Sequence, residues 1–261
     1  MALEPESARN WRKQAQFDYI GPFVKAWAAF NAWFRELSGE WQDARGIEYV
    51  CSRDNLVKNT ACPLLRGNSE RAADFKSKIG ALHNCLEAYD LNKRDRDGNI
   101  SPIKFTSVCI SRWDGAPVRF ESRGIHYQVI KQNGSWISTI RGQNGNETFR
   151  FEQQEWDLAI FEASARFRRL TGNKGPFMRQ TYLRANPRPI VNLLEGEAAP
   201  IEAGNIVFRC SPEDLFTGLI TTIYDMRNCL LHGELSPNER ALRCYDPAFW
   251  ILREFLDFAD A

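Results

Sequence analysis

The hydrophobic pattern of this chain of 261 residues changes its period twice, and this change limits the possible fold more than any other feature. Near the N-terminus, Trp27, Phe30 and Phe34 recur at intervals of three and four residues, which is the spacing of one helix face. Residues 103–151 instead hold short runs of β-branched and aromatic residues, and helical spacing returns after residue 155. The pattern predicts a mainly α fold, α+β overall, with a small antiparallel β-sheet inserted at residues 103–152 of a single domain spanning 1–261.

Helix signals delimit five segments, at residues 17–37, 69–89, 155–170, 211–232 and from 246 onward. The fourth has the clearest ends. Ser211 is a suitable N-cap, Pro212 takes the first helical position, and Gly233 can adopt the left-handed conformation that ends a helix.

Strand signals fill the middle of the chain, at residues 103–111, 118–121, 125–131, 136–141 and 148–151. Asn133-Gly134 predicts a tight hairpin turn between two of these runs. The charged residues 92–99 predict a loop, and residues 205–209 are a further candidate strand. We expect irregular structure around Pro187, Pro189 and Pro200.

Composition excludes several classes of protein. The 34 basic and 33 acidic residues leave a net charge of +1, so any site for nucleic acid must be a local patch. Arginine outnumbers lysine by 25 to 9, which suits phosphate partners, although GC-rich codon usage produces the same excess. Seven cysteines without a C-x-x-C pair, and only three histidines, predict neither a disulfide framework nor a metal site, and we expect no cofactor. No long apolar run occurs, so we expect a cytoplasmic protein that does not enter a membrane.

One charged side chain falls on the apolar stripe of the helix predicted at residues 211–232. Arg227 needs an acid, a phosphate or a wet interface there, and Asp225 and Glu234 are nearby candidates for the acid. His232 follows in the last turn, where the helix dipole favours the imidazolium. Capping of the last carbonyls is an equally simple explanation of both residues.

Residues 224–234, Tyr-Asp-Met-Arg-Asn-Cys-Leu-Leu-His-Gly-Glu, resemble the signature of the HEPN superfamily. In that family an arginine, usually followed by a polar residue, precedes a histidine by four to six intervening positions. Residues 27–34, Trp-Ala-Ala-Phe-Asn-Ala-Trp-Phe, resemble the first helix of many prokaryotic HEPN proteins. The resemblance covers that helix and the region from Glu213 to Phe255, and the strand-rich middle departs from it.

The resemblance implies a HEPN-like helical bundle that forms a homodimer with a shared cleft. Many members are metal-independent endoribonucleases that act as toxins or in phage defence, so RNA is the implied substrate and an antitoxin or another regulatory protein a possible partner. His232 would then transfer protons, Arg227 would neutralise the phosphorane, and Asn228 would position a phosphate or the histidine. Because one histidine cannot be base and acid at once, the chemistry itself favours two subunits.

A second feature is independent of the family. Between Glu162 and Glu195 no acidic residue occurs. The same stretch contains seven basic residues: Arg166, Arg168, Arg169, Lys174, Arg179, Arg184 and Arg188. Interleaved with Phe167, Phe177 and Tyr182, they predict a track for single-stranded RNA with phosphate contacts and stacking rings. The alternative is a solvated surface balanced by acids elsewhere in the fold.

The remaining candidates favour structural roles. His83 and His126 are interpreted as structural, and Asn31 as a buried hydrogen-bonding residue. The alternative to an enzyme is a catalytically silent HEPN-like module that binds RNA or a nucleotide, or that dimerises. An inaccessible Arg227 paired to an internal acid would favour that alternative.

Overall fold

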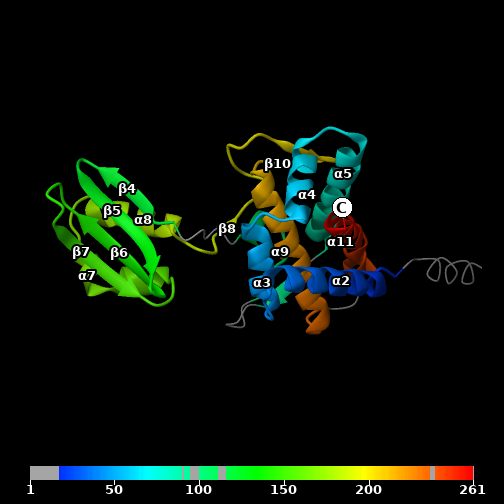
Figure 1. Ribbon diagram of the computed structural model, residues 1–261, viewed down its shortest axis with the longest axis horizontal. Coiled ribbons are helices and arrows are strands. Elements are labelled where there is room, and N and C mark those ends of the chain that lie inside the picture. Colours follow the sequence, from blue (N-terminus) through cyan, green and yellow to red (C-terminus); the bar gives the residue numbers. More distant parts are fainter. Residues whose placement is uncertain (1–17, 90, 95–99, 111–115, 236–238, 261) are drawn as a thin grey trace, which may run out of the picture. The chain divides into compact units, whose positions relative to one another are not determined.

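Figure 1 shows the computed structural model, which describes residues 18–89, 91–94, 100–110, 116–235 and 239–260. The chain divides into two compact units, a first unit of Met1–Cys109 with Ile190–Ala261 and a second unit of Ile110–Pro189. Helices and small antiparallel sheets occur together, which confirms the α+β class; a HEPN-like arrangement stays a prediction. The second unit is inserted into the first between two short strands, β3 (Val108–Cys109) and β8 (Ile190–Val191). These two strands pair antiparallel.

The first unit is built mainly from helices. They are α2 (Ile20–Ser38), α3 (Asp43–Ser52), α4 (Leu56–Arg66), α5 (Glu70–Ala88), α9 (Pro212–Leu231), α10 (Glu239–Leu242) and α11 (Tyr245–Ala259). The α11 helix packs against α2, α4 and α5, and α9 packs against α3 and α4 (Figure 1). At the centre, the Phe255 ring of α11 lies 5.7–6.2 Å from the rings of Phe30, Phe75 and Phe216.

Helices α3 and α4 of the first unit were not predicted from the sequence, because tertiary packing outweighs the weak local helix propensity of these segments. Gly46 lies inside α3, where an added Cβ would come within 2.6 Å of the Phe34 side chain, so glycine permits close packing on α2. Pro63 lies inside α4, which begins after Asn55, a residue whose side chain accepts a hydrogen bond from the Lys58 N–H.

The small sheets of the first unit correct two predictions. The 3-10 helix η1 (Phe105–Ser107) interrupts the strand expected at residues 103–111, because it directs Phe105 into the core, 5.5 Å from the Phe208 ring. The stretch expected as a loop starts instead with a strand, β1 (Asn92–Arg94), paired with β2 (Ile100–Pro102); residues 95–99 lie outside the described part. The candidate strand at residues 205–209 is confirmed as β10 (Ile206–Phe208), paired with β9 (Ile201–Ala203).

The second unit contains a four-stranded antiparallel sheet in the order β4-β5-β6-β7. Its strands are β4 (Val118–Ser122), β5 (Ile125–Gln132), β6 (Ser135–Arg141) and β7 (Glu147–Gln153). Asn133 and Gly134 have φ values of 51° and 82°, which confirms the predicted hairpin turn.

Three short helices complete the second unit: α6 (Leu158–Ala163), α7 (Ala165–Arg168) and α8 (Lys174–Arg184). Tyr127 and Ile140 point from the sheet into a core that also contains Phe161 and Tyr182 from the helices. Because the sheet is covered by these helices, the compact unit has other bounds than the β-rich insert predicted at residues 103–152.

The prediction of one continuous helix at residues 155–170 is wrong, because the structure has two short helices there, α6 and α7. Ser164 adopts φ −62° and ψ 136°, and its Oγ accepts a hydrogen bond from the Phe167 N–H, so one residue ends α6 and caps α7. The α8 helix was not predicted, because glycine and proline, here Gly175-Pro176, commonly follow the end of a helix. Both residues occupy the first turn of α8, where a missing N–H costs little.

Candidate functional site

The three candidate catalytic residues lie at the C-terminal end of α9. The helix begins as predicted, with the Ser211 Oγ accepting a hydrogen bond from the Asp214 N–H at 3.0 Å. At its other end Gly233 has a φ of 69°, which confirms the left-handed stop. The apolar stripe is buried at Leu215, Leu219, Ile220, Ile223 and Met226. Local signals therefore place the end of α9, and the core holds the helix in position.

Two neighbours hold the guanidinium of Arg227. Its Nη1 donates a hydrogen bond to Asn228 Oδ1 at 2.9 Å, and its Nη2 lies 3.5 Å from Asp43 Oδ2. The side chain is 23% exposed, and within the described part of the chain its Nε is buried without a hydrogen-bond partner. Arg227 is thus paired with an internal acid, and its side chain stays partly exposed.

Asp43 also accepts hydrogen bonds from two side chains of α2. Its Oδ1 accepts hydrogen bonds from Asn31 Nδ2 and Arg35 Nη2, each at 2.8 Å. The hydrogen-bonding role expected of Asn31 is confirmed, although the residue is only half-buried. A stacked pair of rings, Trp27 and Tyr224 with centroids 5.9 Å apart, joins α2 to α9 nearby. Three helices therefore supply this cluster.

The ionisation of Asp43 follows from these contacts. Burial disfavours the carboxylate, but hydrogen bonds from Asn31 and Arg35 and the positive charge of Arg227 outweigh it, so the pKa of Asp43 lies below its ordinary value of 3.8. Asp43 is consequently a carboxylate at neutral pH, and it holds the Arg227 guanidinium in one orientation.

The acids considered as partners of Arg227 have other contacts. Asp225 Oδ2 lies 2.5 Å from Lys93 Nζ, and burial raises the pKa of Asp225 against the opposing effect of that lysine. Glu234 Oε2 accepts a hydrogen bond from the Arg94 N–H at 3.2 Å. Sequence reasoning missed Asp43 because this acid belongs to no motif and is the first residue of a helix that was not predicted.

His232 is the residue at which α9 ends. Its backbone N–H donates to the Asn228 carbonyl at 2.9 Å, and its side chain is exposed. Residues four apart share one helix face, so Asn228 lies on the face of His232 and also contacts Arg227. The structure thus brings Arg227, Asn228 and His232 to one exposed helix end, beside Asp43.

The seven basic residues predicted to bind RNA all belong to the second unit, on α7, α8 and the segments around them. All except the half-buried Lys174 are exposed. Arg166 donates to the Arg150 carbonyl at 2.8 Å, and Arg179 Nε lies 2.5 Å from Glu162 Oε1. Their contacts with RNA stay a prediction.

The aromatic part of that predicted track is wrong at Tyr182. Tyr182 is fully buried, with its ring 4.1 Å from that of Phe161, and it cannot stack on a base. Phe177 packs against Phe120, with centroids 5.1 Å apart, and Phe167 packs against Phe161 at 4.7 Å. These rings alternate with arginines in the sequence because one side of each short helix faces the core.

The other histidines differ in their surroundings. His83 is 5% exposed, and burial lowers its pKa, in agreement with a structural role. His126 is exposed on β5, with Nδ1 3.2 Å from Glu121 Oε2. None of the seven cysteines, all within the described part of the chain, forms a disulfide.

Comparison with models of protein families, with curated proteins and with solved structures found no match. Among the described residues, no group of three or more His, Cys, Asp or Glu side chains is arranged to hold a metal ion. No helix within that part is both long and apolar enough to cross a bilayer.

Proposed function

We propose that this chain is a metal-independent endoribonuclease of the HEPN type, which cleaves single-stranded RNA through the 2′-OH as a toxin or phage-defence effector in the cytoplasm. The observation that carries the proposal is the arrangement of Arg227, held by Asp43 and Asn228, five residues before the exposed His232. The resemblance of residues 224–234 to the HEPN signature supports the same function.

Arg227 supplies the positive charge that the reaction needs. A phosphodiester gains negative charge as it becomes a phosphorane, and a fixed cation lowers that barrier by roughly 3–4 kcal/mol in comparable sites. Asn228 contacts Nη1 and Asp43 lies near Nη2, and the side chain stays 23% exposed, so we expect a phosphate oxygen to approach the guanidinium through that exposed part. Asp43 and Asn228 are therefore assigned positioning roles.

His232 supplies proton transfer. A neutral imidazole removes the proton from the 2′-OH, the 2′-oxygen bonds to phosphorus, and the bond from phosphorus to the 5′-oxygen breaks. An imidazolium gives a proton to that 5′-oxygen, and a 2′,3′-cyclic phosphate remains. One imidazole cannot hold both protonation states at once, so we assign the second to another copy of the chain in a homodimer.

Apolar side chains beside the site support such a dimer. Trp41, two residues before Asp43, is 86% exposed, and Leu231, immediately before His232, is 50% exposed. We place the proposed dimer contact on these two side chains, because a second subunit would remove their apolar surface from water. An antitoxin or another regulatory protein is a further proposed partner of this surface.

The test is RNA cleavage by purified wild type, His232→Ala and Arg227→Ala, with EDTA present throughout. We expect each substitution to lower the cleavage rate by about 10²–10⁴-fold, because each removes one element of the chemistry. Arg53→Ala and Arg253→Ala, changes of exposed arginines elsewhere in the first unit, should retain wild-type rates. Equal cleavage by all five proteins would refute the proposal.

The second candidate is a catalytically silent module that binds RNA or dimerises. The ion pair between Arg227 and Asp43 favours it, because this pair already satisfies much of the guanidinium without a ligand. If it is correct, purified wild type and His232→Ala should bind RNA equally and neither should cleave it. Asp43→Asn should then alter stability alone.

A further inference from the structure

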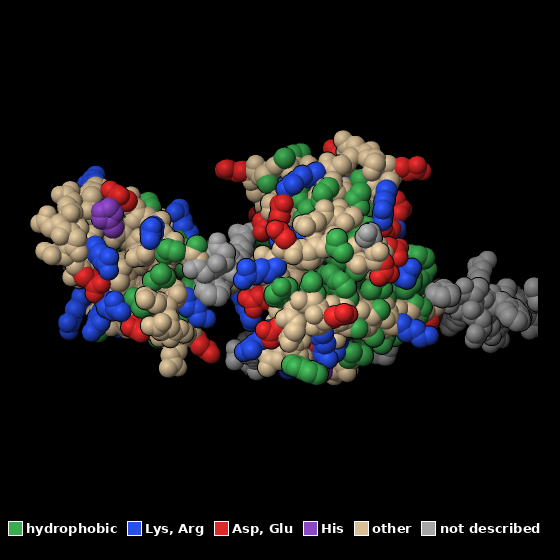
Figure 2. All heavy atoms as spheres, viewed as in Figure 1, with side chains coloured by type: hydrophobic (Ala, Val, Ile, Leu, Met, Phe, Trp, Pro, Cys, Tyr) green, Lys and Arg blue, Asp and Glu red, His purple; other side chains and the backbone are tan. Residues whose placement is uncertain are grey.

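The small net charge of the chain conceals two oppositely charged units. The segment Ile110–Pro189 contains thirteen arginines and lysines and seven acids, a net charge of +6. The remainder contains twenty-one basic and twenty-six acidic residues, a net charge of −5. Figure 2 shows several basic side chains on the visible face of the second unit. Such an excess of positive charge favours a polyanionic partner.

The sheet of the second unit has a polar face opposite the face that packs on α6 and α8, which we name the open face. Register places four of its residues side by side in one row across the strands: Arg119, Gln128, Thr139 and Arg150. At about 4.8 Å between neighbouring strands, the row extends roughly 14 Å. The sheet thus presents an arginine on each edge strand with two hydrogen-bonding residues between them.

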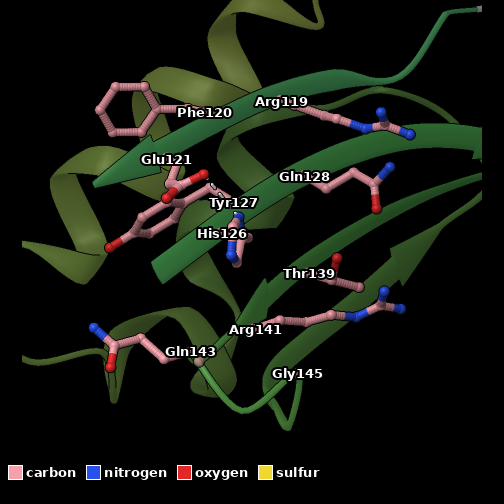
Figure 3. Close-up of a pocket in the computed structure, with 11 residues that line it drawn as sticks. Arg119, Phe120, Glu121, His126, Tyr127, Gln128, Thr139, Arg141, Gln143 and Gly145 are labelled. Atoms are coloured by element: carbon pink, nitrogen blue, oxygen red, sulfur yellow. Dashed lines mark ion pairs between the residues drawn. The ribbon is translucent and has the colours of Figure 1, made fainter. Parts of the chain in front are cut away.

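A pocket of about 560 Å³ lies at one end of this row. Figure 3 shows the polar ends of Arg119, Gln128 and Arg141 projecting toward the same side. Thr139 also lines this pocket and is only 5% exposed, because longer side chains surround it. The sheet therefore provides two guanidinium groups with an amide and a hydroxyl between them.

The charges in this pocket leave its arginines available. Arg119 is exposed and has no ion pair within the described residues, and Arg141 Nη2 is 3.9 Å from Glu147 Oε2, a long contact. The acid that lines the pocket, Glu121, lies beside His126 at 3.2 Å.

The β6–β7 turn closes one end of the pocket. The Gln143 Nε2 donates a hydrogen bond to the Arg123 carbonyl at 3.3 Å. Gly124 has a φ of 72°, and a Cβ there would come within 2.4 Å of the Gln143 side chain. The glycine therefore lets the turn lie against the neighbouring hairpin.

The other end of the row leads into a second hollow, of about 370 Å³. Arg150 lines it together with Arg166 and Arg169 from α7 and its end. Glu147 lines it too, 3.8 Å from Arg150 Nη1. Counted together, the two hollows are lined by five arginines and two glutamates.

We infer that single-stranded RNA crosses the open face along this row, with phosphates on Arg119 and Arg141 in the pocket and on Arg150 and Arg166 in the hollow. Gln128 and Thr139 between them donate to or accept from the sugar and base. Two basic hollows joined by a row of polar side chains fit a polymer, since a mononucleotide fills only one. Because phosphate contacts carry no sequence information, we expect binding to tolerate many sequences. The inference concerns binding and stands apart from the cleavage proposed for His232.

The test measures binding by the full chain carrying His232→Ala, so that RNA stays intact. The probe is a labelled ten-nucleotide RNA, followed by fluorescence anisotropy across a range of salt concentrations. Arg119→Gln with Arg141→Gln should weaken binding about tenfold or more and lower the log–log salt slope by about 1.4, because about 0.7 is lost per phosphate contact on a single strand. Arg150→Gln with Arg166→Gln should do the same. The matched control is Arg53→Gln with Arg243→Gln, which removes two exposed arginines of the first unit.

Three outcomes would overturn the inference. In the first, either double variant, shown to be folded by circular dichroism, would bind RNA with an affinity within twofold of that of its parent. In the second, the control pair would lower the affinity as much as the two test pairs do. In the third, AMP would displace the RNA at equal concentration, which would make the pocket a mononucleotide site. An affinity that rises with RNA length from one to ten nucleotides would support the inference.

Discussion

The two units of this protein use arginine in opposite ways. In the acidic first unit, Arg227 lies on a helix face that packs on the core, and an ionised Asp43 holds its guanidinium. In the basic second unit, Arg119 extends from an edge strand without an ion pair in the described residues. The first arrangement fixes one cation in place, and the second leaves the exposed Arg119 able to meet a ligand. The net charge of the whole chain, +1, reveals neither of these two arrangements.

The units also differ in how they bury aromatic rings, and this gives the largest expected effect. Phe161, in the second unit, is fully buried between Tyr182 and Phe167. Phe161→Ala should destabilise that unit by roughly 3–5 kcal/mol, because it leaves a cavity in a small core. Hydrogen exchange should then accelerate in residues 118–184 and remain slow in α2 and α11.

The matched change in the first unit is Phe255→Ala, at a ring that is equally buried. It should reverse the pattern, with faster exchange in α2, α5 and α11 and little change in the sheet. If either variant accelerated exchange equally in both units, they would form one cooperative structure and the comparison would fail.

Asp43→Asn should produce the next largest effect. It removes the charge that accepts hydrogen bonds from Asn31 and Arg35 and pairs with Arg227, so we expect a loss of about 2 kcal/mol in the free energy of unfolding at pH 7. Urea titration measures it. RNA cleavage should fall as well, because Arg227 loses its fixed orientation.

The pH dependence of that loss has a defined sign. The pKa of Asp43 is lowered in the folded state, so its contribution is present above the ordinary value of 3.8 and is lost as pH falls through the lower folded value. Wild type and Asp43→Asn should therefore differ most at neutral pH and converge in strong acid. A difference that grew below pH 4 would contradict this assignment.

Glu213→Gln should have the smallest effect. It breaks the ion pair with Arg66 at 2.6 Å, but both side chains are largely exposed, at 45% and 59%. Solvent screens such pairs, so we expect a change below about 1 kcal/mol by the same urea titration. A loss as large as that of Asp43→Asn would remove the distinction between buried and exposed ion pairs.

Local signals sufficed wherever neighbouring residues determine the backbone. Ser211, Pro212 and Gly233 set both ends of α9, and Asn133-Gly134 sets the β5–β6 turn, because caps and tight turns depend on contacts a few residues apart. The same kind of signal gave a wrong prediction at Gly175-Pro176, because glycine and proline occur both after the end of a helix and in its first turn.

The sequence by itself determined which residues could carry chemistry: Arg227 on an apolar helix face, His232 at its end, and a run of cations without acids at residues 163–194. Only the tertiary structure decided their surroundings. It placed Asp43 against Arg227, buried Tyr182 in a core, and aligned Arg119 with Arg150 in one row, with Gln128 and Thr139 between them. The physical reason is that side-chain pairing between distant segments depends on how helices and strands pack, and no local pattern records that packing.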